Sequence, residues 1–562
     1  MGMDFNRLVS IYEQLSKTPQ RIEKTDILAA FLRQIEDNEL PAVILLLQGR
    51  VYPLWDSRTL GFSSRSILKA TSRASGVSEN DVEQKWRETG DLGTAATQVL
   101  TSHQQKTLFS EKLTILKVFT VLQKLASLEG ERSSDMKIHL VSELLTAATP
   151  PEAKFLVRIV LDELRIGMGD GTLRDALLLA FAPVSREDRE AYVPAIDAVQ
   201  RALDLCNDFG VVALQLKTHG LDGIKQITLC VGVPLQVMLS LKEKTISAAY
   251  ERVGKSAVLE YKLDGFRLQI HKNAGVKLYT RRLENVTQQF PDIVTAVSHV
   301  PDNVILDCEV IGVVNNTFVP FQDISQRIKR KHDILAMAEK LPVHVYVFDI
   351  LFYEKSLLET PLQERRGILR RVVKENERVK IMPCLITADE LEAQRFYEQS
   401  LAAGNEGIMF KSLDAPYQPG ARVGSMVKMK PILETLDLVI VGAEWGEGKR
   451  SEWLSSYTVA CRTDAGLLNI GHVSTGLKEK EEGLRFQDLT VALKPLVLKE
   501  EGKKVVVTPR IVIEIAFEEI QKSSTYGSGY ALRFPRVLRL RPDRDEKTCS
   551  TLADVERIFR EQ

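Results

Sequence analysis

The chain has 562 residues, of which 75 are Lys or Arg and 75 are Asp or Glu, so its formal net charge is zero. This length predicts two to four domains, and zero net charge does not exclude a nucleic-acid partner, because local patches attract a polyanion. The six cysteines contain no C-x-x-C pair, which disfavours a zinc ribbon or a disulfide framework and is typical of an intracellular protein. The most apolar run, 176–184, is too short to span a bilayer, so we expect no membrane association.

Residues 1–222 have the apolar spacing of α-helices. The stripes lie at 27–35, 113–128, 138–145, 155–164 and 195–205. Thr25-Asp26 is expected to cap the first of these helices. The glycine-rich stretch 165–174 separates two others, and a cap at Thr172 would expose backbone N–H groups that suit a phosphate. A plain helix–helix turn is an equally good interpretation of this stretch.

From 223 to 433 the pattern changes to alternating strands and helices. Lys262 lies where one strand, 256–260, gives way to the next, and Asp264-Gly265 beside it favours a turn. A lysine held close to a sheet loses hydration, which favours a neutral, nucleophilic amine. A surface lysine on a hairpin is the plain alternative, and the short K-x-D-G pattern does not separate the two.

Further strands of this region carry charged residues although they otherwise have the composition of a core. They lie at 276–282, 303–312, 343–353, 405–411 and 425–430. Asp307 and Glu309 share one face of their strand because they are two residues apart. A buried charge is costly unless it is paired or bound to a ligand. The repeated occurrence of such charges therefore predicts a polar cavity.

From 434 the chain is mostly β. Five candidate strands occur at 437–444, 457–461, 467–473, 511–517 and 536–540, which is the number in a small barrel such as an OB-fold. Ser550-Thr551 is expected to cap a final helix.

Taken together, the motifs resemble those of the covalent nucleotidyltransferases, and most closely the ATP-dependent DNA ligases of the archaeal and eukaryotic type. The matching motifs are, in the family's order, Lys262-Leu-Asp-Gly265 with Arg267, Thr280-Arg281-Arg282, Asp307-Cys-Glu309, Phe348-Asp349, Glu406-Gly407 to Lys411, Lys428-Met-Lys430 and Arg541-Pro-Asp-Arg544. The last motif usually ends in lysine, where this chain has Arg544. The resemblance covers nearly the whole chain.

The resemblance implies a multidomain fold and a three-step reaction. The fold would comprise an all-α DNA-binding domain at 1–222, an α+β nucleotidyltransferase (adenylation) domain at 223–433, and an OB-fold β-barrel domain with a C-terminal helix at 434–562. The enzyme would take AMP from ATP onto a lysine, transfer it to the 5′-phosphate of a DNA nick, and seal the nick by attack of the 3′-hydroxyl, in replication and repair.

The resemblance also implies residue roles. Lys262 would be the nucleophile, with Lys428 and Lys430 directed at the α-phosphate. Contacts to ATP would come from Glu260, Arg267, Arg281, Phe348, Lys411 and Arg422, with Phe348 stacked on the adenine and Glu260 accepting from its amino group. Glu309 and Glu406 would hold Mg²⁺, although the family also uses the first position to bind the ribose. Arg541 and Arg544 would approach the pyrophosphate by motion about a hinge at 431–437.

Several partners are expected. Nicked duplex DNA would be held through its phosphates by Lys329-Arg330-Lys331, Arg165, Lys449 and Arg450. Gln105, Leu108 and Phe109 resemble the short peptide that docks on a sliding clamp. The alternative is that Leu108 and Phe109 begin the next helix and pack in the core. We expect a monomeric, intracellular, nucleoid-associated protein.

Three other classes of protein share some of these features. An RNA ligase or an mRNA-capping enzyme shares the lysine motif and the barrel, but the long helical domain ahead of Lys262 disfavours both. A non-catalytic DNA-binding protein is disfavoured by the complete set of lysines and glutamates. An NAD-dependent ligase is disfavoured because a cysteine tetrad for a zinc finger is missing.

Overall fold

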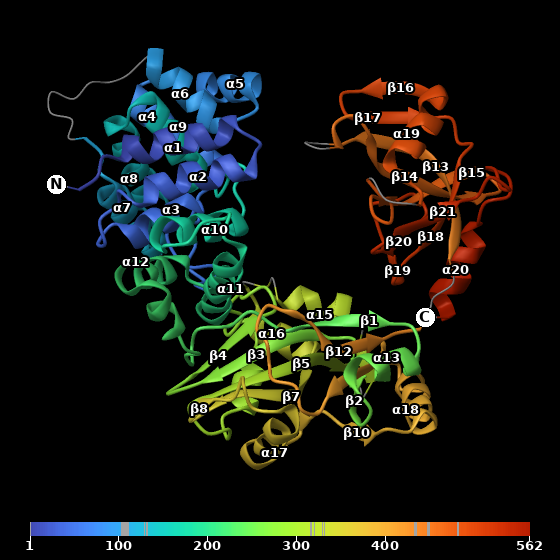
Figure 1. Cartoon of the computed structure of the whole chain (residues 1–562). Helices are drawn as coiled ribbons and strands as arrows, with labels where there is room; N and C mark the ends of the chain where they lie inside the picture. The colour runs from blue at the N-terminus through green and yellow to red at the C-terminus, as the bar shows by residue number, and fades with distance from the viewer. Residues whose placement is uncertain are drawn as a thin grey trace. The chain divides into compact units, whose positions relative to one another are not determined.

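The computed structural model describes residues 2–561 except 103–111, 129, 131–132, 315–316, 320, 329, 331, 432–434, 447–449 and 480–482. The backbone divides into two compact units, Met1–Lys430 and Pro431–Gln562. The first unit contains a helical part and a part with two sheets, and the second is rich in strands (Figure 1). This agrees with the expected fold class of helical, α+β and β-rich OB-type parts.

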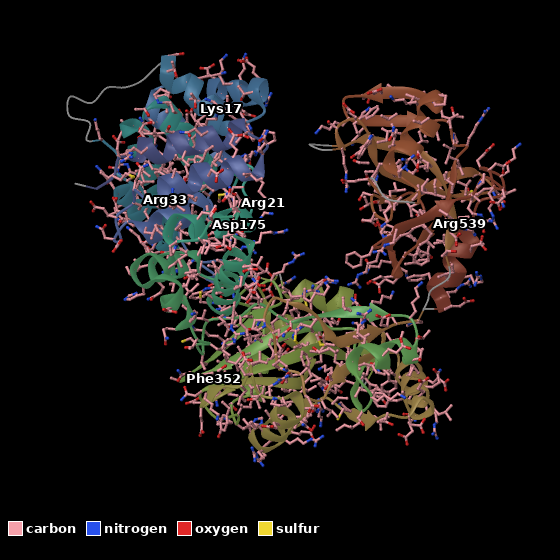
Figure 2. All side chains as sticks on the ribbon, in the orientation of Figure 1. Lys17, Arg21, Arg33, Asp175, Phe352 and Arg539 are labelled. Carbon is pink, nitrogen blue, oxygen red and sulfur yellow. The ribbon has the colours of Figure 1, made fainter. Side chains whose placement is uncertain are left out.

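The first part of unit Met1–Lys430 is built of helices around one hydrophobic core. Those of the described residues are α1 (Phe5–Lys17), α2 (Arg21–Leu32), α3 (Leu40–Leu47), α4 (Ser64–Ser75), α5 (Glu79–Thr89), α6 (Leu92–Ser102), α7 (Ile115–Ser127), α8 (Ser133–Ala147), α9 (Pro150–Val160), α10 (Asp170–Phe181), α11 (Arg189–Cys206) and α12 (Phe209–Lys225). Helices α2 and α10 pack together, and the ion pair between Arg21 and Asp175, 2.6 Å long, joins them (Figure 2).

Two of the three expected helix caps are wrong. Helix α2 begins at Arg21, so Thr25 lies inside it, and its buried hydroxyl donates to the carbonyl oxygen of Arg21 at 2.9 Å. Helix α10 begins at Asp170 after the extended N-cap residue Gly169, so Thr172 lies within the helix. In both cases a buried threonine packs in the helix instead of ending it, because burial against neighbouring helices outweighs its preference for a cap.

The second part of this unit contains two sheets. The five-stranded sheet has the order β1 (Leu239–Glu243), β12 (Arg422–Met429), β11 (Gly407–Ser412), β2 (Ala257–Lys262), β10 (Cys384–Thr387). The other has the order β4 (Val276–Thr280), β3 (Phe266–Lys272), β5 (Val304–Val314), β7 (Val343–Tyr353), β8 (Lys355–Ser356), with β6 (Thr317–Val319) on β5 and β9 (Val379–Ile381) on β7. Strands β2 and β3 are consecutive in the chain and belong to different sheets.

Helices cover one side of each sheet and complete its core. Helices α13 (Ile246–Val253) and α18 (Glu390–Ala402) pack on the five-stranded sheet. Helices α14 (Pro291–Ala296), α15 (Phe321–Ile328) and α17 (Leu362–Val372) pack on the other, and α16 (Ile334–Lys340) contacts α14 and α15. Charged side chains of the two sheets lie close enough to act on one another, as Lys262 of β2 does on Glu309 of β5.

The crossing from β2 to β3 depends on Gly265. A Cβ at this position would lie 2.3 Å from the carbonyl oxygen of Val310 in β5. Only glycine lets the link approach the backbone of the neighbouring strand so closely. The link therefore holds the end of β2, where Lys262 lies, against the second sheet.

Unit Pro431–Gln562 contains strands β13 (Leu436–Trp445), β14 (Leu454–Thr463), β15 (Gly466–Val473), β16 (Val497–Glu501), β17 (Lys504–Val507), β18 (Val512–Ala516), β19 (Glu519–Lys522), β20 (Tyr530–Arg533) and β21 (Arg536–Leu540), with helices α19 (Phe486–Leu493) and α20 (Leu552–Glu561). The main sheet has the order β15-β14-β13-β17-β16, and β18 pairs with both β13 and β21. The five expected strands are present, while β16, β17, β19 and β20 were not expected. Thr551 caps α20, since its hydroxyl accepts from the backbone N–H of Asp554 at 3.1 Å.

In the part of the chain that the structure describes, every helix is too short or too polar to cross a membrane.

Candidate active site

Three strands of the five-stranded sheet end or begin around Lys262. Lys262 is the last residue of β2, and its carbonyl accepts from the backbone N–H of Glu406, just ahead of β11. The Nζ atom of Lys262 contacts Glu406 Oε2, and Lys430 Nζ lies 3.0 Å from the same oxygen. Gly407 makes this possible, because a Cβ there would lie 2.1 Å from the carbonyl oxygen of Met429. The result is one carboxylate shared by two lysines.

Glu406 is charged in this cluster. Burial raises its pKa, but the nearby Lys262 and Lys430 lower it by more, so the pKa lies below its ordinary value. A carboxylate that remains ionised keeps both ammonium groups in place.

Arg267 is held by several partners across the second sheet. Its Nε and Nη2 atoms donate to Asp307 at 2.9 and 2.6 Å, and its Nη1 donates to the carbonyl of Met238 at 2.6 Å. Burial alone would lower the pKa of Arg267, but Asp307 and its other neighbours raise it above the ordinary value. Nη2 also lies 3.0 Å from the hydroxyl of Tyr417. Among the described residues, these contacts use four of the five N–H bonds of the guanidinium group, so that one is left for a ligand.

Tyr417 is a site residue that the sequence did not predict. Its hydroxyl donates to Asp307 Oδ2 at 2.8 Å and accepts from the backbone N–H of Met238 at 3.2 Å. Burial raises the pKa of Tyr417 far above its usual value, so the hydroxyl keeps its proton and donates. The only signal in the sequence is an aromatic residue in a loop with Pro416 and Gly420, which does not identify its partners.

Glu309 lies opposite Arg267 where β3 pairs with β5. Burial raises the pKa of Glu309 to about 7, although the positive charges of Lys262 and Arg267 oppose this. Near neutral pH this carboxyl group is therefore poised between its two forms, and a further cation would ionise it. Among the described residues, no three His, Cys, Asp or Glu side chains gather as a metal cluster. Mg²⁺ bound mainly by phosphates and water needs only one or two carboxylates, which Glu309 and Glu406 fit.

Phe348 lies in β7 beside two cations. Lys411 Nζ is 4.4 Å from the ring centre, and the guanidinium carbon of Arg267 is 5.3 Å from it. A small pocket beside Phe348 is also lined by Met238, Tyr417 and Met426. Its ring thus contributes to a pocket that both sheets form.

Asp349, next to Phe348, forms an ion pair inside the protein. Its carboxylate receives a two-pronged ion pair from Arg365 of α17, at 2.8 and 2.9 Å, and both side chains are buried. This pair fastens α17 to β7.

Glu260 is also buried and fully engaged with cations. Lys411 Nζ lies 2.5 Å from its Oε2, and Arg366 of α17 contacts its Oε1. Arg366 was not predicted, because an arginine in an amphipathic helix normally faces solvent. The predicted contact from Glu260 to the adenine amino group stays a prediction, since each carboxylate oxygen accepts more than one hydrogen bond.

The other predicted ATP contacts of the first unit lie at strand ends. Lys428 is half-buried in β12, two residues before Lys430. Arg422 is exposed at the start of β12, opposite Leu239, whose neighbour Met238 lines the Phe348 pocket. Arg281 is exposed just after β4.

In the second unit, Arg541 and Arg544 both contact Asp437. Arg541 Nη1 lies 2.6 Å and Arg544 Nε 3.2 Å from Asp437 Oδ2. Arg541 also forms a two-pronged pair with Asp543, at 2.9 and 2.7 Å. The hydrogen bonds from Arg541 lower the pKa of Asp543 to about 2.

The predicted DNA and clamp contacts are partly described. Gln105, Leu108, Phe109, Lys329, Lys331 and Lys449 lie outside the described residues. Arg165 pairs with Glu163 at 2.5 Å and with Asp91 at 3.5 Å. Arg450 pairs with Glu479 at 2.7 Å, and Arg330 with Asp333 at 3.5 Å. DNA phosphates would therefore have to compete with these carboxylates for the three arginines.

A helical part, a part with two sheets and a lysine–glutamate–lysine cluster at the strand ends, and a β-rich unit with paired arginines fit the class of nucleotidyltransferases. Three known families match successive parts of the chain: "DNA ligase N terminus" at 4–178, "ATP dependent DNA ligase domain" at 237–430 and "ATP dependent DNA ligase C terminal region" at 450–544. The chain belongs to the ATP-dependent DNA ligases, of the archaeal type, which seal nicks in DNA.

Relatives match over their full length. The DNA ligase of Nanoarchaeum equitans is 44% identical over 572 residues, which covers 100% of this chain and 99% of the relative. The DNA ligase of Archaeoglobus fulgidus is 41% identical over 565 residues, with coverage of 100% and 99%. A solved structure named Pmar-Lig_PreS3 has a TM-score of 0.52 at 16% identity and covers 95% of this chain and 99% of that one, a likeness in fold alone. The RNA-end and non-catalytic alternatives therefore have no support.

Proposed function

We propose that Lys262 is the residue that takes AMP from ATP. The observation that supports this most directly is its position at the end of β2, with Nζ against a carboxylate that Lys430 also contacts. In the first step the ammonium group of Lys262 loses two protons to solvent, one before and one after the attack, and the Nζ–P bond forms at the α-phosphate. The bond from that phosphorus to the bridging oxygen breaks, and pyrophosphate leaves.

Two further phosphoryl transfers complete the reaction. The 5′-phosphate of the nick attacks the phosphorus of the lysine–AMP, and Lys262 leaves and takes up two protons from solvent to regain its ammonium form. The 3′-hydroxyl then attacks the adenylated 5′-phosphate, loses its proton and displaces AMP. In all three steps catalysis depends on positioning and on neutralising phosphate charge.

The lysine cluster suits the first step. Lys428 and Lys430 lie two residues apart, as required for side chains directed at one phosphate. Nζ of Lys262 is held in an ion pair with Glu406, and an amine held by a carboxylate is not free to face the α-phosphate. We infer that Glu406 must move from Lys262 towards another cation before the attack.

Glu309 and Glu406 are the residues that would hold Mg²⁺. The ion, when bound, supplies charge neutralisation at the phosphates. The raised pKa of Glu309 fits this role, since an approaching cation would convert it to a carboxylate. Glu406 can contribute only as far as it is released from the two lysines.

The pocket beside Phe348 suits the nucleoside. Phe348 offers an aromatic face for stacking, with Lys411 and Glu260 next to it. Arg267 has one N–H bond left for the ribose or a phosphate oxygen, so it would bind as a single donor. Arg281 and Arg422 would approach from the rim, since both are exposed.

The two units would move relative to each other during the cycle. The division of the chain at Lys430 and Pro431 supports a hinge in the segment 431–437. Arg541 and Arg544 would approach the pyrophosphate during adenylation of Lys262 and withdraw when DNA binds.

We also propose that the chain works as a monomer on nicked duplex DNA and docks on a sliding clamp through Gln105, Leu108 and Phe109. The support is the peptide pattern itself. Leu108→Ala combined with Phe109→Ala should abolish only the stimulation of sealing by the clamp. A large drop in melting temperature would instead assign the two residues to the core.

One labelling experiment tests the proposed chemistry. The protein is incubated with ATP, GTP or NAD labelled in the nucleotidyl phosphate and then chased with nicked duplex DNA. Label should pass from ATP to the protein and then to DNA, and Lys262→Ala and Lys262→Arg should both abolish the first transfer. Both variants should still seal a pre-adenylated nick slowly, because that step uses no lysine adduct. Normal labelling of Lys262→Ala would rule out this nucleophile.

A further inference from the structure

Asp437 joins the two arginines of the last motif to the first strand of the second unit. It is the second residue of β13 and lies six residues after Pro431. Its Oδ2 atom accepts a hydrogen bond from Arg541 Nη1 at 2.6 Å and lies 3.2 Å from Arg544 Nε in an ion pair. Its Oδ1 atom is buried and has no hydrogen-bond partner among the described residues. Oδ2 therefore contacts both arginines, whereas Oδ1 has no hydrogen-bond partner among the described residues.

The carboxylate is held rigidly by its own backbone. The N–H of Asp437 donates to Ser550 Oγ at 2.9 Å, and the N–H of Ser550 donates to the carbonyl of Asp437 at 2.7 Å. On its other side, Asp437 lies opposite Glu514 where β13 pairs with β18. Asp437 is thus fixed between two neighbouring segments, and only 8% of it is exposed.

The two arginines differ in how firmly they are held. Arg541 forms ion pairs with Asp437 and Asp543, its backbone N–H donates to Val512, and its side chain is 15% exposed. Arg544 has the single, longer contact with Asp437 and a hydrogen bond to the carbonyl of Thr548 at 3.0 Å, and its side chain is 36% exposed. A long, partly exposed ion pair is weak, so Arg544 can exchange Asp437 for another anion far more easily than Arg541 can.

We propose that Asp437 is a positioning residue for the self-adenylation step. It anchors Arg541 and presents Arg544 so that Arg544 exchanges this carboxylate for the pyrophosphate portion of ATP. The inference rests on the proposed role of the two arginines in that step. It assigns them different tasks: Arg541 holds the motif in shape, and Arg544 contacts the phosphates.

The position of Asp437 in β13 determines how the two arginines would move with the second unit. Asp437 follows the segment between the two units directly, and it is bonded to the arginines and to Ser550. Any movement of the second unit would therefore carry Asp437 and the two arginines together with β13. Arg541 would keep its place on Asp437, so that only the Arg544 guanidinium has to change partner when it meets the phosphates.

The test uses Asp437→Asn in the full chain, which keeps the shape of the side chain and removes its charge. Two rates are measured: formation of the protein–AMP adduct over a range of ATP concentrations, and single-turnover sealing of a pre-adenylated nick. We expect the efficiency of adduct formation to fall at least about tenfold, mainly through a higher KM for ATP. The reason is that a misplaced Arg544 would lose one charge-assisted contact with the phosphates. Sealing of the pre-adenylated nick should stay within about twofold.

Glu514→Gln is the matched control. Glu514 faces Asp437 on the neighbouring strand and pairs with a different arginine, Arg539, at 2.6 Å. The same change from carboxylate to amide there should leave both rates within about twofold. Asp437→Glu keeps the charge and displaces it by one methylene. It should also raise the KM for ATP without slowing sealing, and it decides the question if Asp437→Asn does not fold.

Two outcomes would overturn the role of Asp437. One is unchanged adduct formation in both Asp437 variants. The other is an equal loss of both rates together with a lower melting temperature, which would indicate a purely structural residue. Arg544→Ala is measured in parallel: if it leaves adduct formation intact, the proposed role of the arginine pair is wrong, independently of the result for Asp437.

Discussion

At the scale of single residues, Tyr417 offers a sharp test of how Arg267 is positioned. The change Tyr417→Phe removes only a hydroxyl that bonds Asp307, Arg267 and the backbone of Met238. We expect adduct formation to fall about tenfold, because Arg267 loses a constraint, and stability to fall by about 1–3 kcal/mol, because buried groups lose a partner. Both are measured by labelling with ATP and by urea unfolding.

Tyr250→Phe is the control for this variant. Tyr250 is equally buried in the same part of the chain, and its hydroxyl donates to the carbonyl of Thr387 at 3.1 Å, away from the charged cluster. Its loss should lower stability by a similar amount and leave adduct formation unchanged. Similar activities of the two variants would contradict a positioning role for Tyr417.

His271 makes the stability of the first unit depend on pH. Burial, and secondarily the charge of Lys277, lower the pKa of His271 to about 3, while its ring accepts from the backbone N–H of Gly232 and packs on Tyr279. In the unfolded chain the histidine binds a proton near pH 6.5, so the contribution to stability is complete above that pH. It is lost as the pH falls from about 6.5 towards 3, by about 1.4 kcal/mol per pH unit.

The measurement is urea unfolding of the wild type and His271→Gln at pH 7.5 and pH 5. The variant should be less stable at pH 7.5, and the difference between the two proteins should shrink at pH 5. The exposed His219 provides the control, since His219→Gln should give parallel curves. A difference that is constant with pH would show that His271 is not the group responsible.

At the scale of secondary-structure elements, the crossing between β2 and β3 places Lys262. In Gly265→Ala the added Cβ would collide with the carbonyl oxygen of Val310, 2.3 Å away, and push the crossing off β5. We expect adduct formation to fall by about a hundredfold or more, because misplacing a reacting group by about 1 Å is that costly. Gly275→Ala, in the turn between β3 and β4 where a Cβ would meet nothing within 4 Å, should behave as the wild type. Normal labelling of Gly265→Ala would mean that the crossing does not control Lys262.

At the scale of the whole molecule, binding to a nick should be electrostatic and indifferent to sequence. An enzyme that seals any nick must rely on phosphates and duplex shape, although its formal net charge is zero. The logarithm of the affinity should fall linearly with the logarithm of salt concentration, equally for two duplexes of unrelated sequence. Arg165→Ala should reduce the slope by about one. A flat salt dependence would contradict phosphate-dominated binding.

The sequence by itself determined the kind of protein and most of its elements. Apolar periodicity and strand composition are local properties, so β7 was predicted as 343–353 and is found as Val343–Tyr353. The order of the short motifs along the chain indicated the family, since each motif is a contiguous string of residues. Charges on strands that otherwise look buried predicted a polar site, because such charges must find partners.

Only the tertiary structure decided which polar and charged side chains meet. The pairs Lys262–Glu406, Tyr417–Asp307 and Arg366–Glu260 each join residues more than a hundred positions apart. No local pattern specifies such partners, because they depend on how separate sheets and helices pack. Packing also decided that Thr25 lies within a helix, that Asp349 forms an ion pair with Arg365, and that Asp437 contacts Arg541 and Arg544. Each of these outcomes follows from burial, which a residue acquires only from neighbours that the fold brings to it.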